Sequence, residues 1–212
     1  LKKNFNRSDC LIAFGGGITL ATVEAYGPQR IDCVEVVPAV VDAGVYFSDH
    51  NNRVYERFGQ GRLELISEDG RNHVLRSDRT YDLIIGDATH PGTADSWVLY
   101  TEEFYRLCQK RLNPGGLVAQ WLPLHGLTVD DFKMILRTFQ AVFPHASLWL
   151  TRSYAVMLAT PEKLSIDVEQ LETRLRETLI NKQLDDVFLG DAVSLLSTFA
   201  LSEKGMAEYV GT

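Results

Sequence analysis

The stretch Tyr81-Asp-Leu-Ile-Ile-Gly-Asp87-Ala-Thr-His-Pro91 is an apolar run that ends abruptly in a carboxylate. The run predicts a buried strand over residues 81–86, and the polar segment after it predicts a loop closed by Pro91 and Gly92. Open parallel sheets bind their ligands beyond the carboxyl ends of their strands. We therefore expect Asp87 to lie at the functional edge of such a sheet.

Similar apolar runs recur along the chain and alternate with amphipathic segments, which is typical of βαβ units. The expected strands cover residues 10–14, 31–35, 62–67, 81–86, 117–121, 145–150 and 154–159. The expected helices cover residues 18–26, a segment from Pro38, 70–76, 101–111, and a segment that either Thr128 or Asp130 could cap. A turn at residues 151–153 predicts a closing hairpin, and hence one antiparallel strand in a mostly parallel sheet.

The domain organisation follows from the same pattern. Residues 1–160 are expected to form one Rossmann-like α/β domain, and residues 161–212, where the pattern is helical only, a C-terminal helical extension of it. The chain starts with Leu1 rather than Met and stops directly after a helical pattern. We therefore expect it to be a piece of a longer polypeptide.

Composition narrows the class of function. Of 212 residues, 45% are hydrophobic and 23% are charged, as in ordinary globular proteins, and the net charge of −7 disfavours nucleic acid as a partner. No apolar run approaches the length of a membrane span, and no signal peptide opens the chain. The spacing of the five histidines and of Cys10, Cys33 and Cys108 predicts no metal site and a reducing, cytoplasmic location.

Three further strand ends carry residues suited to a nucleoside. Glycines at Gly15 and Gly17 follow the first predicted strand, where they would let the backbone approach a ligand, although tight turns need glycine too. Glu35 ends the second strand, where a carboxylate can accept both ribose hydroxyls, and an exposed glutamate is the alternative. The pair Asp69-Gly70 follows the third strand, where Asp69 could accept from an adenine amino group, cap a helix, or do both. These positions and Asp87 form an ordered set.

The residues of several segments resemble the spermidine synthases, the family of polyamine aminopropyltransferases, over about residues 8–160. The segments are Val34-Glu-Val-Val-Pro-Ala-Val-Val41, Glu68-Asp-Gly-Arg-Asn72, Tyr81–Asp87, Leu99-Tyr-Thr-Glu-Glu-Phe-Tyr105 and Leu112-Asn-Pro-Gly-Gly116. Residues 120–127, 137–145 and 190–196 are similar to spermidine-synthase-like domains fused to multi-span transporter-like segments. An attached membrane segment outside this chain, and a homodimer, are further expectations.

The resemblance implies a class I S-adenosylmethionine-dependent methyltransferase fold with a seven-stranded sheet. It also implies an aminopropyl donor, decarboxylated S-adenosylmethionine, and a small-molecule amine acceptor. Carried over by position, Asp87 is the catalytic residue. The donor would be bound by Gly15, Gly17, Glu35, Val36, Asp69 and Gly70. The substrate would be bound by His90, Tyr100 and Gln120.

Two departures from the family pattern keep alternatives open. His90 stands where the family has a second acid that holds the polyamine, and Ile18 stands where its glycine loop continues into an acid. One hypothesis is an aminopropyltransferase with an altered acceptor. The second is a methyltransferase that uses S-adenosylmethionine itself, and the third is a non-catalytic nucleoside-binding domain of a transporter-like protein. His90 itself either contacts the substrate or only caps its loop.

Overall fold

A single mixed sheet organises the protein. The computed structural model describes residues 9–87, 90–93, 96–177 and 181–211, and the sheet runs in the order β3-β2-β1-β4-β5-β7-β6-β8. The strands are β1 (Asp9–Ala13), β2 (Arg30–Val34), β3 (Leu63–Ile66), β4 (Tyr81–Gly86), β5 (Leu112–Pro123), β6 (Ala146–Leu150), β7 (Tyr154–Ala159) and β8 (Phe199–Leu201). Pairing is parallel from β3 to β5, whereas β7 is antiparallel to β5 and β6.

The prediction of a seven-stranded sheet with one antiparallel strand is one strand too few, because the sheet has eight strands. The eighth strand, β8, pairs antiparallel with β6 and lies in the segment that was expected to be helical only. It escapes prediction because three residues are too few to show a period of two. The ring of Phe199 packs edge-on against that of Trp149 at 5.3 Å, which anchors β8 to its neighbour.

Helices follow most strands at the places that the pattern predicts. They are α1 (Ile18–Ala25), α2 (Pro38–Ala43), α3 (Ser48–Asn51), α4 (Gly70–Arg76), α5 (Glu102–Lys110), α6 (Val129–Val142), α7 (Val168–Glu177), α8 (Asn181–Asp186), α9 (Ala192–Leu196) and α10 (Glu203–Val210), with short 3₁₀ helices η2 (Gly44–Phe47), η3 (Val54–Arg57) and η4 (Ser96–Tyr100). Thr128, and not Asp130, caps α6, because its hydroxyl and the Asp131 carboxylate form a reciprocal capping box.

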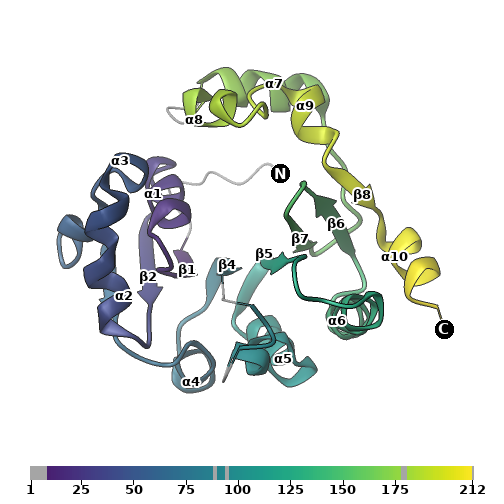
Figure 1. Cartoon of the computed structure of the whole chain (residues 1–212), viewed down its shortest axis with the longest axis horizontal. Helices are drawn as coiled ribbons and strands as arrows, with labels where there is room; N and C mark the ends of the chain where they lie inside the picture. Colours follow the sequence, from purple (N-terminus) through teal and green to yellow (C-terminus); the bar gives the residue numbers. More distant parts are fainter. Residues whose placement is uncertain (1–8, 88–89, 94–95, 178–180, 212) are drawn as a thin grey trace.

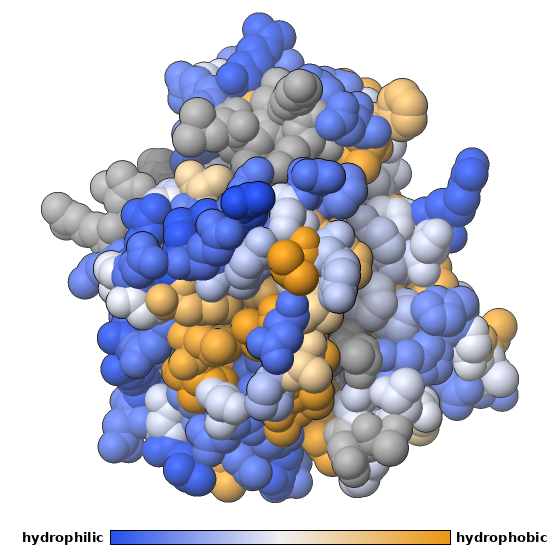
Figure 2. Space-filling model, turned by 60° about the vertical axis from the view of Figure 1, so that its left-hand side comes forward, coloured by the Kyte–Doolittle hydropathy of each residue, from blue (hydrophilic) through white to orange (hydrophobic). Residues whose placement is uncertain are grey.

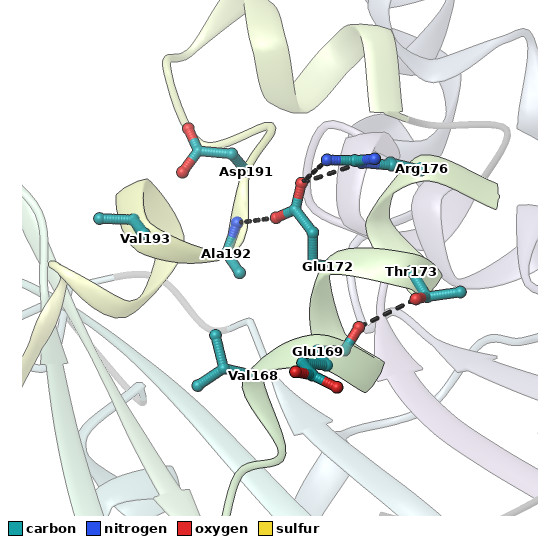
Figure 3. Close-up of a pocket in the computed structure, with 8 residues that line it drawn as sticks. All are labelled: Val168, Glu169, Glu172, Thr173, Arg176, Asp191, Ala192 and Val193. Carbon is teal, nitrogen blue, oxygen red and sulfur yellow. Dashed lines mark hydrogen bonds and ion pairs between the residues drawn. The ribbon is translucent and has the colours of Figure 1, made fainter.

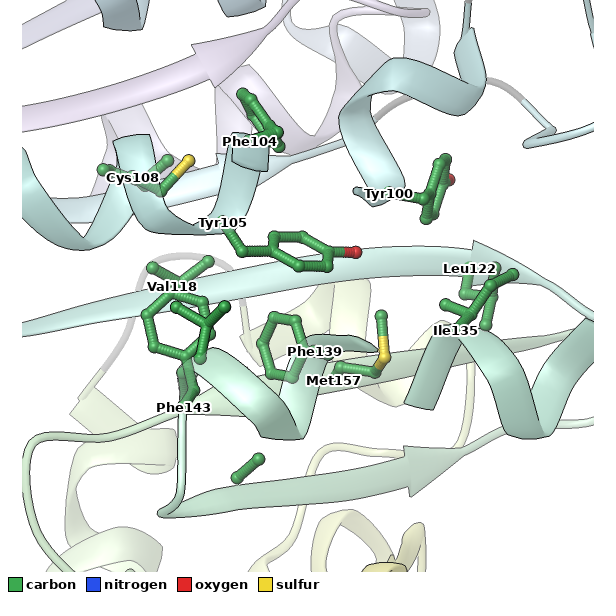
Figure 4. Close-up of a cluster of buried hydrophobic side chains, with 14 of the residues drawn as sticks. Tyr100, Phe104, Tyr105, Cys108, Val118, Leu122, Ile135, Phe139, Phe143 and Met157 are labelled. Atoms are coloured by element: carbon green, nitrogen blue, oxygen red, sulfur yellow. The ribbon is translucent and has the colours of Figure 1, made fainter. Parts of the chain in front are cut away.

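The helices cover the two faces of the sheet unequally (Figure 1). On one face α4, α5, α6 and α10 pack on the larger core, whose aromatic centre is Tyr105, Phe139 and Phe143 (Figure 4). On the other face α1 packs on the alternate residues of β1 and β2 to form a smaller core. Farther along that second face, side chains of α7 and α9 line a pocket together with Trp149 of β6 and Leu158 of β7.

Strand β5 differs from its expected bounds. It begins at Leu112 rather than at residue 117, so the predicted turn at residues 113–116 lies within the strand. The pairing with β4 moves from Tyr81–Leu112 to Leu83–Leu117, so the extra residues of β5 are accommodated as an irregularity in the ladder. The carboxyl half of β5 is regular, and this half leads to the candidate site.

A buried carboxylate that sequence patterns did not single out joins β2 to β4. Asp32 is fully buried and accepts from Arg30 Nε at 2.7 Å, from the Tyr81 hydroxyl at 2.8 Å and from Arg79 Nη1 at 3.3 Å. The Tyr81 hydroxyl is also 3.1 Å from Nε2 of His73 on α4. This network satisfies a buried charge and fixes α4 against the sheet.

Hydrophobic side chains gather on the surface that carries α1 to α3, as Figure 2 shows. The segment around α2 is one source of exposed hydrophobic side chains: α2 buries none of its residues, and Val36, Val37 and Phe47 are all exposed. Within the described residues, no helix combines the length and the apolar character that crossing a membrane requires.

Candidate active site

The carboxyl ends of four adjacent strands meet at one edge of the sheet. Ala13 of β1 pairs with Val34 of β2, and Val34 pairs with Ile66 of β3. On the other side Ile12 of β1 pairs with Ile85 of β4. The residues that follow these strands are the glycine loop, Glu35, the segment before Asp69, and Asp87. The register therefore brings the predicted set to a common edge, as the βαβ argument requires.

The glycine loop makes a tight turn into α1. Gly17 has a φ of +79° and is the N-terminal cap of the helix, and its N–H donates to the Phe14 carbonyl at 2.7 Å. A side chain at Gly17 would meet Phe14, Asn51 and Val54 at 3.1–3.2 Å, so this glycine is required by conformation and by space. Gly15, by contrast, faces open space. The backbone at Gly15 is therefore accessible to a ligand.

Asn51 holds the glycine loop in place, and sequence reasoning missed it. Its fully buried amide donates to the carbonyl oxygens of Gly16 at 3.0 Å and Gly44 at 2.8 Å, and its Oδ1 accepts from the N–H of Arg53 at 3.0 Å. A single side chain thus ties α3 to the loop before α1 and to the end of α2. No local pattern marks such a residue, because its partners lie elsewhere in the chain.

Glu35 and Val36 follow β2 directly. One carboxylate oxygen of Glu35 accepts from the N–H of Val37 at 2.9 Å, which fixes the side chain at the strand end. The backbone N–H of Glu35 donates to the carbonyl of Ile66 at 3.0 Å, which links this position to β3. Val36 is 58% exposed, so its side chain offers an apolar surface beside the carboxylate.

Asp69 caps α4, as one of the two predicted readings states. Its Oδ1 accepts from the N–H of Asn72 at 2.8 Å, and α4 starts at Gly70. A side chain at Gly70 would meet no atom within 4 Å, so the start of α4 is open. The second carboxylate oxygen of Asp69 has no bond to the helix in the described structure. Capping and ligand binding are therefore compatible at this residue.

Asp87 is a largely buried carboxylate at the end of β4. Burial raises the pKa of its carboxyl group, and a hydrogen bond from the Thr19 hydroxyl on α1 lowers it in part. Thr19 lies in the first turn after the glycine loop, so this bond joins the predicted donor side of the edge to the predicted catalytic residue. Sequence reasoning did not assign a role to Thr19.

Tyr100 and Gln120 lie next to Asp87 under the same edge. Burial raises the pKa of the Tyr100 hydroxyl above its usual range, and the negative charge of Asp87 contributes to that rise. The Tyr100 hydroxyl and the Gln120 amide both donate to the carbonyl of Trp121, at 3.1 and 3.0 Å. The amide of Gln120 also donates to the carbonyl of Gly86 at 3.1 Å. These bonds fix the ends of β4 and β5 together.

His90 contacts backbone groups with both of its ring nitrogens. Its Nδ1 accepts from the N–H of Gly92 at 2.9 Å, and its Nε2 is 2.7 Å from the carbonyl oxygen of His125. The His90 and His125 rings lie with their centroids 5.3 Å apart. Of the two predicted possibilities for His90, the loop contact is the one that this geometry contains.

An acidic hollow of about 480 Å³ lies between α7 and α9, and none of the predicted site residues lines it (Figure 3). Its Glu172 accepts from the N–H of Ala192 at 2.8 Å and pairs with Arg176 at 2.9 Å, while Asp191 caps α9. Glu172 thus joins the two helices, and Asp191 is engaged within α9. No group of three or more potential metal ligands occurs among the residues that the structure describes.

Comparison with known proteins places these features in a family. The Spermine/spermidine synthase domain matches residues 4–160. Polyamine aminopropyltransferases of Escherichia coli O1:K1 / APEC and of Shigella flexneri are 35% identical over 118 residues. These alignments cover 52% of this chain and 38% of each relative. The chain thus spans well under half the length of the curated relatives that it matches.

Several solved structures have a fold similar to that of this chain. A spermidine synthase in complex with the transition-state analogue AdoDATO has a TM-score of 0.78 at 22% identity, covering 97% of this chain and 70% of that one. The Thermotoga maritima spermidine synthase has a TM-score of 0.75 at 22% identity, covering 98% and 70%. Human methyltransferase-like protein 13 in complex with SAH has a TM-score of 0.60 at 21% identity, covering 79% and 78%. At these identities the similarity establishes the fold.

Proposed function

Because the chain belongs to the spermine/spermidine synthase family, we propose that its site transfers an aminopropyl group from decarboxylated S-adenosylmethionine to an amine. The observation that carries the proposal is Asp87, a partly buried carboxylate at the edge where the glycine loop, Glu35 and Asp69 also lie. The curated aminopropyltransferase relatives at 35% identity support the same reaction class.

The chemistry of the acceptor explains why a carboxylate is needed. A primary amine has a pKa near 10, so exposing its lone pair at pH 7 costs about 4 kcal/mol. A carboxylate that holds the ammonium and takes up its proton reduces this cost. Burial raises the pKa of Asp87, which makes it a better proton acceptor than an exposed aspartate. Tyr100 and Gln120 would form the neutral wall of the amine site.

The donor fits the remaining residues. The open backbone at Gly15 would approach the nucleoside, with Gly17 shaping the turn behind it, and Glu35 would accept from the ribose hydroxyls. Val36 would pack against the adenine, and Asp69 with Gly70 would meet its amino group. The sulfonium of the donor is cationic, so an edge that carries several carboxylates suits it.

The proposed transfer is a single displacement. The amine nitrogen forms a bond to the methylene carbon next to the sulfonium, and the carbon–sulfur bond breaks with its electron pair moving to sulfur. Asp87 takes the ammonium proton before the attack, so the product nitrogen keeps its two remaining hydrogens and leaves as a secondary ammonium. The donor leaves as a neutral thioether nucleoside, and the positive charge of the sulfonium is carried away on the product nitrogen.

Asp87→Asn tests the catalytic assignment. The variant is isosteric and keeps a polar group beside Thr19, so we expect turnover of an amine panel to fall at least 10²-fold while donor affinity by calorimetry changes less than about threefold. Asp78→Asn, an exposed carboxylate before β4, is the matched control. Equal turnover by Asp87→Asn and wild type would refute the role of Asp87.

Calorimetry with both donors separates the proposal from its alternatives. We expect decarboxylated S-adenosylmethionine to bind more tightly than the carboxylated form. The methyltransferase hypothesis stays open because Ile18 carries no charge that could distinguish the two donors. Binding of the carboxylated form alone would favour that hypothesis. Nucleoside binding with no transfer to any amine would favour a non-catalytic domain. A cytoplasmic location, a homodimer, an attached membrane segment and the division at residue 160 remain predictions.

A further inference from the structure

We propose that His90 is a positioning residue: its imidazole, as the neutral tautomer protonated on Nε2, ties the loop after β4 to the loop after β5 and so holds the Asp87 segment in place. The effect on catalysis rests on the proposed function. The tie itself is a structural feature that can be tested without any substrate.

Hydrogen-bond accounting assigns the tautomer. The N–H of Gly92 points at Nδ1 of His90 at 2.9 Å, so Nδ1 must be an acceptor and carries no proton. The His125 carbonyl oxygen, 2.7 Å from Nε2, can only accept, so Nε2 must donate. A neutral imidazole with one proton on Nε2 satisfies both contacts at once. A carboxylate in place of His90 could accept from Gly92 but would face the His125 carbonyl with like partial charge.

The space around the ring is shaped for this one arrangement. A side chain at Gly126 would lie 3.0 Å from Nε2 of His90, and one at Gly92 would lie 3.1 Å from Nδ1. Gly126 also has a φ of +74°, which favours glycine. The local turn is closed by Thr93, whose N–H and hydroxyl both donate to the His90 carbonyl, at 2.9 and 2.7 Å. The imidazole thus fits between two glycines of different loops.

The tie has a counterpart on the other side of Asp87. The residue before it, Gly86, accepts from the Gln120 amide of β5 at 3.1 Å, and His90 reaches the loop after β5 at 2.7 Å. Asp87 therefore lies between two bonds that both lead from the β4 side to the β5 side. A carboxylate that must meet an amine in one orientation benefits from such fixation.

Two substitutions of His90 separate the two bonds. His90→Asn places an acceptor where Nδ1 lies and keeps the Gly92 contact only, whereas His90→Gln reaches farther and keeps a donor for the His125 carbonyl. We expect His90→Asn to lower kcat for amine transfer at least tenfold and His90→Gln to stay within about threefold, with the donor dissociation constant unchanged in both. His145→Asn, at the amino-terminal end of β6, controls for the loss of a histidine.

Amide hydrogen exchange and nitrogen-15 NMR provide readouts that need no activity. Wild type should show a protonated Nε2 and a bare Nδ1 at His90, and residues 124–127 should exchange at least tenfold faster in His90→Asn and in Gly126→Ala, but not in His90→Gln. Unchanged exchange in His90→Asn, or a proton on Nδ1, would overturn the tie. If exchange behaves as expected but wild type transfers nothing to amines, the proposed function fails and the tie stands.

Loss of amine affinity in both His90 variants, with exchange unchanged, would instead show that His90 contacts the substrate. That outcome would also overturn the proposal, because the two nitrogens would then be free for a ligand.

Discussion

The Thr19 hydroxyl hydrogen-bonds the Asp87 carboxylate and thereby joins the first turn of α1 to the end of β4. Burial raises the pKa of Asp87, and this bond opposes the rise. The two residues come from opposite sides of the candidate site, one after the glycine loop and one at the predicted catalytic position. The contact therefore couples the geometry of the donor loop to the protonation of the proposed base.

Thr19→Val should move the pH dependence of activity. The valine keeps the shape but cannot donate, so the pKa of Asp87 rises further, and the carboxylate is protonated at a higher pH. We expect the acid limb of kcat/KM for amine transfer to shift to higher pH, with Thr19→Ser close to wild type. A limb that stays in place in Thr19→Val, measured between pH 5 and 9 under constant ionic strength, would contradict this prediction.

Asp87→Asn should make the protein more stable at neutral pH while it removes activity. The pKa of Asp87 in the folded state is raised above the ordinary 3.8, so the folded state binds a proton more tightly than the unfolded chain does. Wild type consequently loses stability as pH rises from 3.8 through the folded pKa, and this loss persists above it. The asparagine has no such loss.

Thermal melts of wild type and Asp87→Asn from pH 3 to 8 test whether the substitution raises Tm and whether that gain depends on pH. The gain in Tm of Asp87→Asn should be full at pH 7 and should vanish below about pH 3.8, where the wild-type carboxyl group is protonated in both states. A gain that is independent of pH would mean that packing, and not the buried charge, separates the two proteins.

The sequence predicts the framework of the site because strand ends are a local property. Glu35, Asp69 and Asp87 each follow an apolar run, and the parallel register of the strands brings these run ends to one edge of the sheet. The roles of Thr19 and Asn51 and the contact of His90 with His125 could not be predicted, because each depends on a partner distant in the chain. The separation of Asn51 from Gly16, for example, is 35 positions. The eighth strand could not be predicted for a different reason: its three residues are too few to show a period of two.

Asn51→Ala should weaken donor binding, because Asn51 holds the glycine loop through the Gly16 carbonyl. It leaves the carbonyl oxygens of Gly16 and Gly44 without their donor, so we expect a loss of about 1–3 kcal/mol in the free energy of unfolding. The freed glycine loop should raise the donor dissociation constant, measured by calorimetry below the melting range. An unchanged dissociation constant alongside lower stability would confine Asn51 to a structural role.

Tyr105→Phe should leave stability unchanged or raise it by up to about 1 kcal/mol, which is about 2–4 °C in Tm. The Tyr105 hydroxyl is buried in the larger core and has no hydrogen-bond partner among the described residues, so removing it relieves a desolvation cost (Figure 4). The ring keeps its edge-on contact with Phe139 at 5.0 Å. Tyr81→Phe is the matched control.

The Tyr81 hydroxyl is as deeply buried but donates to Asp32 at 2.8 Å. Its removal leaves part of the Asp32 charge unpaired, so Tyr81→Phe should cost about 1–3 kcal/mol in urea unfolding, whereas Tyr105→Phe should not. The two variants delete the same atom from the same residue type, and only the presence of a partner differs. Equal losses in both would show that the Tyr105 hydroxyl has a partner of its own, such as a buried water.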